Sequence, residues 1–135
     1  MKKNKVSIAL FCIIAFISSC EKDKGLIPNI SFKTGVTYIS KDTSLPAGSN
    51  FTIGINASKS EDVDVLKQFN ISKSVNGAAA TSEFTKALEG SEGDNYSYDF
   101  TSTLTSNQGQ ANKYTFTVTN RDGLTNQVSV TINTQ

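Results

Sequence analysis

The chain has no His, no Trp, two Cys and two Pro among its 135 residues. The absence of His removes the commonest general base and the commonest zinc ligand. The formal net charge is only +1, so the composition gives no electrostatic basis for binding nucleic acid. Charged side chains make up 19% of the residues, and much of the polarity comes from 17 Ser, 15 Thr and 12 Asn. This composition favours strands joined by turns over long surface helices, within a single domain.

The N-terminus has the pattern of an export signal. Lys2, Lys3 and Lys5 precede an apolar run over residues 6–17 that only Ser7 interrupts, and small residues follow it. A basic start, an apolar stretch and small residues are typical of a signal peptide. The run is too short to span a bilayer, which takes about 20 apolar residues.

The signal ends in Ile17-Ser18-Ser19-Cys20, which resembles the bacterial lipobox. The resemblance implies that residues 1–19 are a lipoprotein signal peptide, cut before Cys20. It also implies that the Cys20 thiol receives a diacylglycerol and that the new amino terminus can be acylated, for example with palmitate. Two or three acyl chains would give a stable membrane anchor. The alternative is an ordinary secretory signal in which Cys20 is incidental.

Residues 20–28 are expected to be the lipidated Cys and a flexible tether, because residues 21–28 are charged, contain Gly25 and end in Pro28 without strand or helix periodicity. Charged residues after the Cys loosely resemble the export tag of surface lipoproteins in Bacteroidota, although here lysines alternate with acids. We therefore expect a lipid-anchored protein of the bacterial cell envelope, in the outer membrane, with the periplasmic and surface faces both open. The mature chain would have no free thiol, because Cys12 leaves with the signal.

From residue 29 onward, apolar and polar residues alternate, most clearly in Tyr114, Phe116 and Val118. This period is typical of half-buried antiparallel strands. The expected strands are 29–33 with 36–40, 50–58, 64–75, 80–88, 96–104, 112–120 and 126–134. About seven short strands over residues 29–135 predict an all-β chain folded as a β-sandwich. Residues 82–89 also fit a helix that ends at Gly90, but an edge strand protected by Lys86 is favoured.

The strand pattern resembles the immunoglobulin-like modules, including PKD-like ones, of envelope lipoproteins in Bacteroidota. The resemblance covers residues 29–135 and rests on four features: Tyr-x-Tyr-x-Phe at 96–100, Tyr-x-Phe-x-Val-x-Asn at 114–120, the turn Asp122-Gly123, and Val-x-Val-x-Ile at 128–132. It implies an immunoglobulin-like antiparallel β-sandwich. The Cys-Trp-Cys core of antibody domains is absent, and neighbouring sandwich families and jelly rolls remain open.

Acidic residues gather in three expected loops. In immunoglobulin connectivity residues 58–64, 89–95 and 120–126 meet at one end of the sandwich. These loops hold seven of the twelve acids of the chain: Glu61, Asp62, Asp64, Glu89, Glu92, Asp94 and Asp122. Carboxylates at one end are a candidate Ca²⁺ site, with Glu61, Asp62, Asp64 and Asp122 as the cage and Asn120 as a further ligand. The alternative is ordinary surface loops whose acids are neutralised by Lys59 and Arg121.

No catalytic site is expected. Without His or a free Cys, a nucleophile would need a Ser–Lys pair, and neighbouring residues such as Ser72 and Lys73 point to opposite faces of a strand. The sequence therefore predicts a non-catalytic structural or protein-interaction module that contacts another envelope protein.

A ligand-binding module, for a glycan or for calcium-dependent adhesion, is the alternative. Glycan sites usually stack sugars on exposed aromatic rings. Tyr96, Tyr98 and Tyr114 are expected to face inward, each with a partner for its hydroxyl, which leaves only Tyr38. The sequence therefore favours protein–protein interaction over glycan binding, with no cofactor apart from the possible Ca²⁺.

Overall fold

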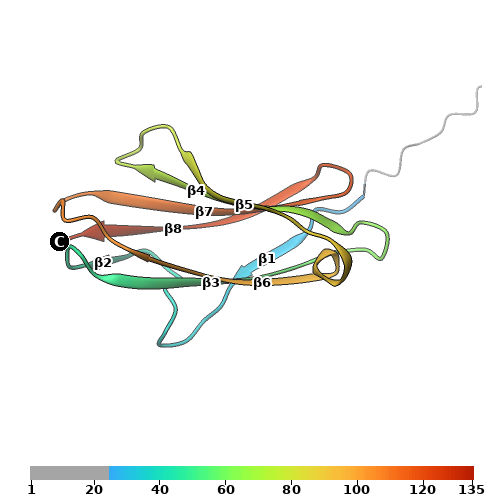
Figure 1. The fold of residues 1–135 in the computed structure, drawn as a ribbon, viewed down its shortest axis with the longest axis horizontal. Helices are drawn as coiled ribbons and strands as arrows, with labels where there is room; N and C mark the ends of the chain where they lie inside the picture. Colours follow the sequence, from blue (N-terminus) through green and yellow to red (C-terminus); the bar gives the residue numbers. More distant parts are fainter. Residues whose placement is uncertain (1–24) are drawn as a thin grey trace, which may run out of the picture.

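The computed structural model describes residues 25–135, which form eight strands and one short 3₁₀ helix (Figure 1). The elements are β1 (Asn29–Phe32), β2 (Thr43–Leu45), β3 (Asn50–Ser58), β4 (Leu66–Val75), β5 (Thr81–Ala87), η1 (Gly90–Gly93), β6 (Asn95–Thr103), β7 (Ala111–Asn120) and β8 (Thr125–Thr134). The expected signal peptide, Cys20 and the first part of the tether lie outside the described residues. Within residues 25–135, no helix has the length and apolar character needed to cross a bilayer.

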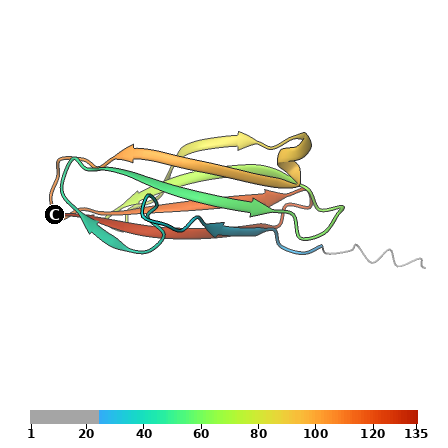
Figure 2. The same cartoon turned by 90° about the horizontal axis from the view of Figure 1, so that it is seen from below.

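The strands form two sheets, one with the order β1-β3-β6 and one with the order β2-β8-β7-β4-β5. Every pair is antiparallel except β2 with β8. Figure 1 shows β4, β7 and β8 in one layer and β3 and β6 in the other, and Figure 2 shows the strands running along the long axis. The order β1-β3-β6 against β8-β7-β4 corresponds to strands A-B-E and G-F-C of immunoglobulin-type sandwiches. The predicted all-β sandwich is confirmed.

The core lies between the two sheets and is built from the alternating apolar positions. Tyr114, Phe116 and Val118 of β7 are each at most 1% exposed. Their rings meet aromatic rings of the other sheet: the Phe116 ring centroid lies 6.0 Å from Phe32, and that of Tyr114 lies 5.3 Å from Phe51. The two-residue alternation therefore turns one side of each sheet inward, as the sequence predicts.

A buried Asn stands at each end of this row on β7. Asn112 is fully buried, and its Nδ2 donates to the Ile132 carbonyl at 3.4 Å and to Thr134 Oγ1 at 3.2 Å. Asn120 is 2% exposed, and its Oδ1 accepts from the backbone N–H groups of Asp122 and Leu124. The three apolar side chains are thus bounded by buried amides, of which Asn112 bonds through Nδ2 while its Oδ1 has no partner within residues 25–135.

The expected strand at 36–40 is wrong. Residues 33–42 form a loop that is held to β3 by bonds from Lys33 N to the Gly54 carbonyl and from Ile39 N to the Thr52 carbonyl. The strand in this region is β2, three residues long and parallel to β8, where the sequence predicted only a loop. Three residues are too few for alternation to show, and the pairing depends on residues almost 90 positions away.

The expected edge strand near residues 82–89 is confirmed as β5, which pairs only with β4. Gly90 begins η1 and does not end a helix. The sequence predicts that Lys86 protects this edge against pairing with another strand, and its side chain also makes contacts within the domain. Its ammonium lies over the Tyr96 ring, 5.2 Å from the centroid, and contacts Glu92 Oε1 at 2.5 Å. Lys86 therefore bridges toward β6.

Candidate functional site

The loops between β3 and β4, β5 and β6, and β7 and β8 meet at one end of the sandwich, as the sequence predicts. Lys59 N donates to the Asp94 carbonyl at 3.0 Å, and Arg121 N donates to the Val65 carbonyl at 2.9 Å, so each loop contacts another. We call residues 25–28, 59–65, 88–94 and 121–124 the loop pole. It lies at the end of the molecule where the chain enters, opposite the C-terminus (Figure 2).

Two of the four candidate calcium ligands come together at the loop pole. Asp64 is 2% exposed, and its Oδ2 accepts from Leu26 N at 3.3 Å. The Arg121 guanidinium lies 3.7 Å from Asp64 Oδ1 and 3.6 Å from Asp122 Oδ1. A Cβ on Gly25 would lie 2.7 Å from Asp64 Oδ2 and 3.1 Å from Asp122 Oδ2. The space beside this pair of carboxylates is therefore taken by Arg121 and by the backbone of residues 25–26.

The structure does not bring the other two candidates into this pair. The Asp62 side chain is fully exposed and lies 3.6 Å from the Lys59 ammonium, while Glu61 accepts from Asp64 N through its backbone carbonyl. Lys59 also pairs with Asp94 at 2.8 Å, and the hydrogen bond to Asp94 is the main reason that the Lys59 pKa is raised. Asn120 directs its Oδ1 at the turn, not at the acids. Within residues 25–135, no three Asp, Glu or Cys side chains lie close enough together to hold a metal ion.

The end of the expected tether is fastened to the loop pole. Asn120 Nδ2 donates to the Leu26 carbonyl at 3.1 Å, Ser60 Oγ to the Ile27 carbonyl at 2.5 Å, and Asn126 Nδ2 to the Pro28 carbonyl at 2.9 Å. With the bond from Leu26 N to Asp64, four hydrogen bonds hold residues 26–28. Sequence periodicity could not show this, because the bonds are made by side chains of distant loops. Residues 26–28 are therefore part of the domain.

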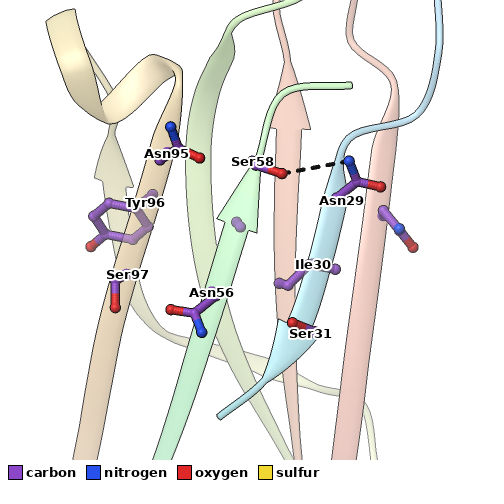
Figure 3. A pocket seen from close by; sticks show the side chains of 10 residues that line it. Asn29, Ile30, Ser31, Asn56, Ser58, Asn95, Tyr96 and Ser97 are labelled. Atoms are coloured by element: carbon purple, nitrogen blue, oxygen red, sulfur yellow. Dashed lines mark hydrogen bonds between the residues drawn. The ribbon is translucent and has the colours of Figure 1, made fainter. Parts of the chain in front are cut away.

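A polar groove of about 560 Å³ crosses the outer face of the three-stranded sheet next to the loop pole (Figure 3). Its lining includes two rows of alternating amides and hydroxyls across the sheet: Asn29, Ser58 and Asn95, and then Ser31, Asn56 and Ser97. Ile30, Ala57, Tyr96 and Asn126 complete the lining. Only Asn29 and Ser58 bond to each other, at 3.5 Å. The other four side chains of the two rows have no hydrogen-bond partner within residues 25–135. The spacing Asn-x-Ser at residues 29–31, 56–58 and 95–97 is visible in the sequence, but in a chain with 17 Ser and 12 Asn such spacings are expected from composition.

The tyrosines do not form an exposed stacking surface. Tyr96 and Tyr114 are buried, which raises the pKa of each to about 12, and Tyr98 is partly buried. Tyr38 is partly exposed, and its hydroxyl donates to Asp99 Oδ2 at 3.2 Å. The hydroxyl of Tyr114 is buried without a partner in the described residues, contrary to the prediction that each inward Tyr finds one.

The basic side chains next to serines do not form nucleophile pairs. The Lys59 ammonium is held by Asp94 and Asp62, and the Lys73 ammonium lies over the Tyr114 ring, 5.5 Å from its centroid. Neither geometry directs the amine at a neighbouring Ser hydroxyl.

No known protein family matches this sequence, and no curated protein is similar to it. Among solved structures, the chain is similar in fold to the sporulation control protein Spo0M from Bacillus subtilis. The TM-score is 0.48 and the identity is 7%, over 81% of this chain and 49% of that one. The chain thus spans about half the length of that protein. The class that the topology defines is an all-β, immunoglobulin-type sandwich.

Proposed function

We propose that this protein is a membrane-anchored envelope lipoprotein of the Bacteroidota type, with a β-sandwich that serves as a non-catalytic interaction module. The lipobox-like sequence at Ile17-Ser18-Ser19-Cys20 supports the anchor. The immunoglobulin-type strand order supports the resemblance to the sandwich modules of such lipoproteins. In this proposal, Cys20 carries the lipid and the sandwich contacts another protein of the envelope.

The observation that carries the proposal is an apolar patch at the loop pole. Among residues 25–135, four large hydrophobic side chains are exposed, and three of them, Leu26, Ile27 and Val63, are more than half exposed on adjoining segments of this pole. The fourth, Val36, lies in the loop between β1 and β2. Apolar side chains at the end where a lipid anchor would attach are suited to the boundary between headgroups and acyl chains.

The short spacing between Cys20 and the domain supports the same orientation. Because residues 26–28 are fastened to the sandwich, only six residue steps separate Cys20 from Leu26, a reach of about 20 Å at most. A lipid on Cys20 would therefore keep the loop pole at the membrane surface. The sides of the sandwich and its far end would remain open to a protein partner.

Replacing Cys20 tests the anchor directly. Cys20→Ala should abolish labelling with radioactive fatty acid and release the chain from membranes, because the thiol is the attachment point for the lipid. A variant that is still labelled and still sediments with membranes would refute the anchor.

Replacing the apolar patch tests the orientation. In the Cys20→Ala background, we expect weak binding to phosphatidylcholine vesicles, and L26S/I27S/V63S should remove it without lowering the melting temperature. The matched control is V36S, which removes a fully exposed apolar side chain away from the loop pole. Equal loss of binding in V36S, or no effect of the triple variant, would contradict the proposed orientation.

A ligand-binding role is the second candidate, and the polar groove is the observation that favours it. Ser31, Asn56, Asn95 and Ser97 have no hydrogen-bond partner among the described residues, and they present uncharged donors and acceptors that suit the hydroxyls of a neutral glycan. An NMR titration with chito-oligosaccharides should shift the side-chain amides of Asn56 and Asn95 and leave that of Asn70, on the other sheet, unchanged. Unshifted groove amides at saturating sugar would exclude these ligands.

A further inference from the structure

The four edge strands of the sandwich differ in how well they are protected against pairing with another strand. Native edges are kept from pairing by being short, by bulges, or by Lys and Pro. β1 has four residues and β2 has three. β5 carries Lys86 and is irregular, since its register against β4 shifts between Ile71 and Ser72. Each of these three edges therefore has at least one protective feature.

The edge of β6 has none of these features. The strand is nine residues long, contains neither Lys nor Pro, and pairs with β3 residue for residue without a register shift. Its one charged side chain, Asp99, is held by the Lys33 ammonium at 2.6 Å and by the Tyr38 hydroxyl at 3.2 Å. β6 is thus a long, regular edge with no unpaired charge.

The residues whose backbone groups face this edge follow from the hydrogen-bond alternation. Lys59 N donates to the Asp94 carbonyl and Leu104 N donates to the Ser49 carbonyl, at the two ends of the β3–β6 ladder. In an antiparallel ladder, every second residue of a strand directs its backbone N–H and C=O groups to the same neighbouring strand. Because Asp94 and Leu104 bond to the chain at the ends of β3, the backbone groups of the even-numbered residues of β6 face β3. The backbone N–H and C=O groups of Ser97, Asp99 and Thr101 therefore face away from β3, and no strand within residues 25–135 pairs with them.

Partly exposed aromatic rings line the opening between the β6 edge and β5. Phe84 of β5 and Tyr98 of β6 stack across it, with their centroids 4.9 Å apart and their planes at 17°. Phe100 of β6 is also partly exposed. In constant-type immunoglobulin sandwiches a further strand, D, pairs beside the strand that corresponds to β6. In this protein no strand within residues 25–135 pairs with that edge of β6, and the side chains of Phe84, Tyr98 and Phe100 lie beside it.

We propose that the β6 edge binds an extended segment of another protein by strand addition. The segment would pair with the backbone of Ser97, Asp99 and Thr101 and would alternate apolar with small polar residues, so that its apolar side chains cover Tyr98, Phe100 and Phe84. The inference deepens the interaction role proposed above by naming the kind of partner segment. Because the edge has no unpaired charge, binding is only weakly sensitive to salt.

The proposed anchor favours a different protein over a second copy. Two β6 edges related by a two-fold axis pair antiparallel, which inverts one copy and places its loop pole at the far end of the other. Nine residues of strand span about 30 Å. The reach from Cys20 to Leu26 is only about 20 Å, so when one loop pole contacts the membrane and the strands stand upright on it, the lipid of the second copy cannot enter the same membrane.

A donor strand fused to the chain tests whether the edge accepts a strand. Ala47 N bonds to the Gln135 carbonyl and Gly48 N to the Thr105 carbonyl, so a Gly-Ser linker after Gln135 starts beside the end of β6. A donor of alternating Val and Thr with Lys at both ends should slow amide exchange at Ser97, Asp99 and Thr101 at least tenfold. The same donor with Pro at alternate positions is the control. Unchanged exchange, or equal slowing with both donors, would overturn the proposal.

Variants of the edge itself sharpen this test. S97P/T101P removes two edge-facing N–H groups while leaving the pairing with β3, and it should abolish the slowing at Asp99. N56A, on the central strand opposite Ser97, should leave the slowing unchanged. Slowing that survives S97P/T101P would contradict the assignment to this edge.

Photo-crosslinking from position 97 in intact cells tests the occupant. The proposal expects a product with another protein, mapped by mass spectrometry to a segment of alternating apolar residues. A product with the same chain, or with no protein, would overturn it. Both tests can be repeated with Cys20→Ala. Because strand addition in the fused chain does not need the lipid, we expect the same slowing of amide exchange in this variant. Failure of strand addition can therefore be distinguished from failure of the proposed anchor.

Discussion

The two sheets of the sandwich differ in how completely their strands are paired. In the five-stranded sheet β4, β7 and β8 each have a partner on both sides, whereas in the three-stranded sheet only β3 does. The burial of most aromatic side chains follows the pairing of their strands: Phe51 of the central strand β3 is buried, whereas Phe84 of the edge strand β5 is partly exposed. Phe69 and Phe116 of the larger sheet are fully buried, while Tyr98 and Phe100 of β6 are partly exposed.

This difference separates the stabilising part of the molecule from the part that presents surface. The larger sheet supplies eight of the fifteen buried core residues and β3 of the smaller sheet supplies four, while the smaller sheet also carries the polar groove and the open β6 edge. Both lie within one small domain that has no disulfide among its described residues, so each depends on packing and hydrogen bonds. If matched substitutions in the two sheets lower the free energy of unfolding by different amounts, the two sheets differ in their contribution to stability as well as in their geometry.

The largest expected effect comes from truncating matched Phe side chains. Phe116→Ala should lower the free energy of unfolding by about 3–5 kcal/mol, because it removes a fully buried ring and leaves a cavity. Phe100→Ala should cost less than half as much, since Phe100 is partly exposed. Urea unfolding of both variants measures the two losses. Equal losses would show that the two sheets contribute alike.

A smaller effect is expected at the loop pole, where β1 and β4 are linked through residues 26–28. Asp64→Ala should cost about 1–3 kcal/mol, because it leaves the Leu26 N–H without its acceptor and removes one of the two carboxylates beside Arg121. Asp62→Ala is the matched control and should stay within about 0.5 kcal/mol, since its side chain is fully exposed. Amide exchange at Leu26 should accelerate only in the first variant. A neutral Asp64→Ala would mean that the pole is not fastened through this carboxylate.

Alkaline titration compares one buried Tyr from each sheet. Burial raises the pKa of Tyr96 in β6 and of Tyr114 in β7 to about 12, and Glu92 and Glu83 respectively add to the rise. A Tyr in an unfolded chain ionises near pH 10. The stability that these neutral hydroxyls contribute is therefore complete below pH 10 and is lost as the pH rises from about 10 to 12.

Phenolate absorbance in Tyr96→Phe and Tyr114→Phe assigns the two steps. If the smaller sheet unfolds locally before the larger one as the pH rises, the absorbance step of Tyr96 occurs at a lower pH than that of Tyr114. Tyr114→Phe should also be nearly neutral in stability at pH 7, because the hydroxyl that it removes has no partner within the described residues. Ionisation of both residues near pH 10 in the folded chain would contradict the burial.

The smallest expected effect is that of calcium. Because Arg121 and the Leu26 N–H already occupy Asp64, millimolar Ca²⁺ should leave the melting temperature unchanged relative to a chelator. A rise that Asp64→Asn and Asp122→Asn each remove would restore the cation site that the sequence suggests.

The sequence predicts the inward rows because alternation is a local property. The row of Tyr114, Phe116 and Val118 and the edge strand β5 are both where the sequence indicates. β2 and the loop over residues 33–42 were missed, since both depend on partners far along the chain. Lys33 and Tyr38 meet Asp99 across Gly54, where a Cβ would lie 2.7 Å from each of the first two side chains. The small size of Gly54 makes this approach possible, but its place in the sequence does not show it.

The loop pole shows the same limit for the candidate site. The topology brings the acidic loops together at one end of the sandwich, and the strand order expected from the sequence predicts this. Which acids meet depends on side-chain direction: Asp64 points inward to Leu26 and Arg121, whereas Asp62 points to solvent. Lys59 and Arg121 form ion pairs with acids of these loops, which fits the alternative of surface loops neutralised by basic neighbours.

The two buried amides of β7 have a consequence for how the strands find their register. A shift by one residue would turn Tyr114, Phe116 and Val118 to solvent, so alternation itself disfavours it. A shift by two residues keeps the alternation and would bring Asn112 or Asn120 into the apolar row. There the amide would lose the partners that it has at the strand end, at a desolvation cost of a few kcal/mol. The amides thus disfavour the misaligned pairings that hydrophobic periodicity alone would tolerate.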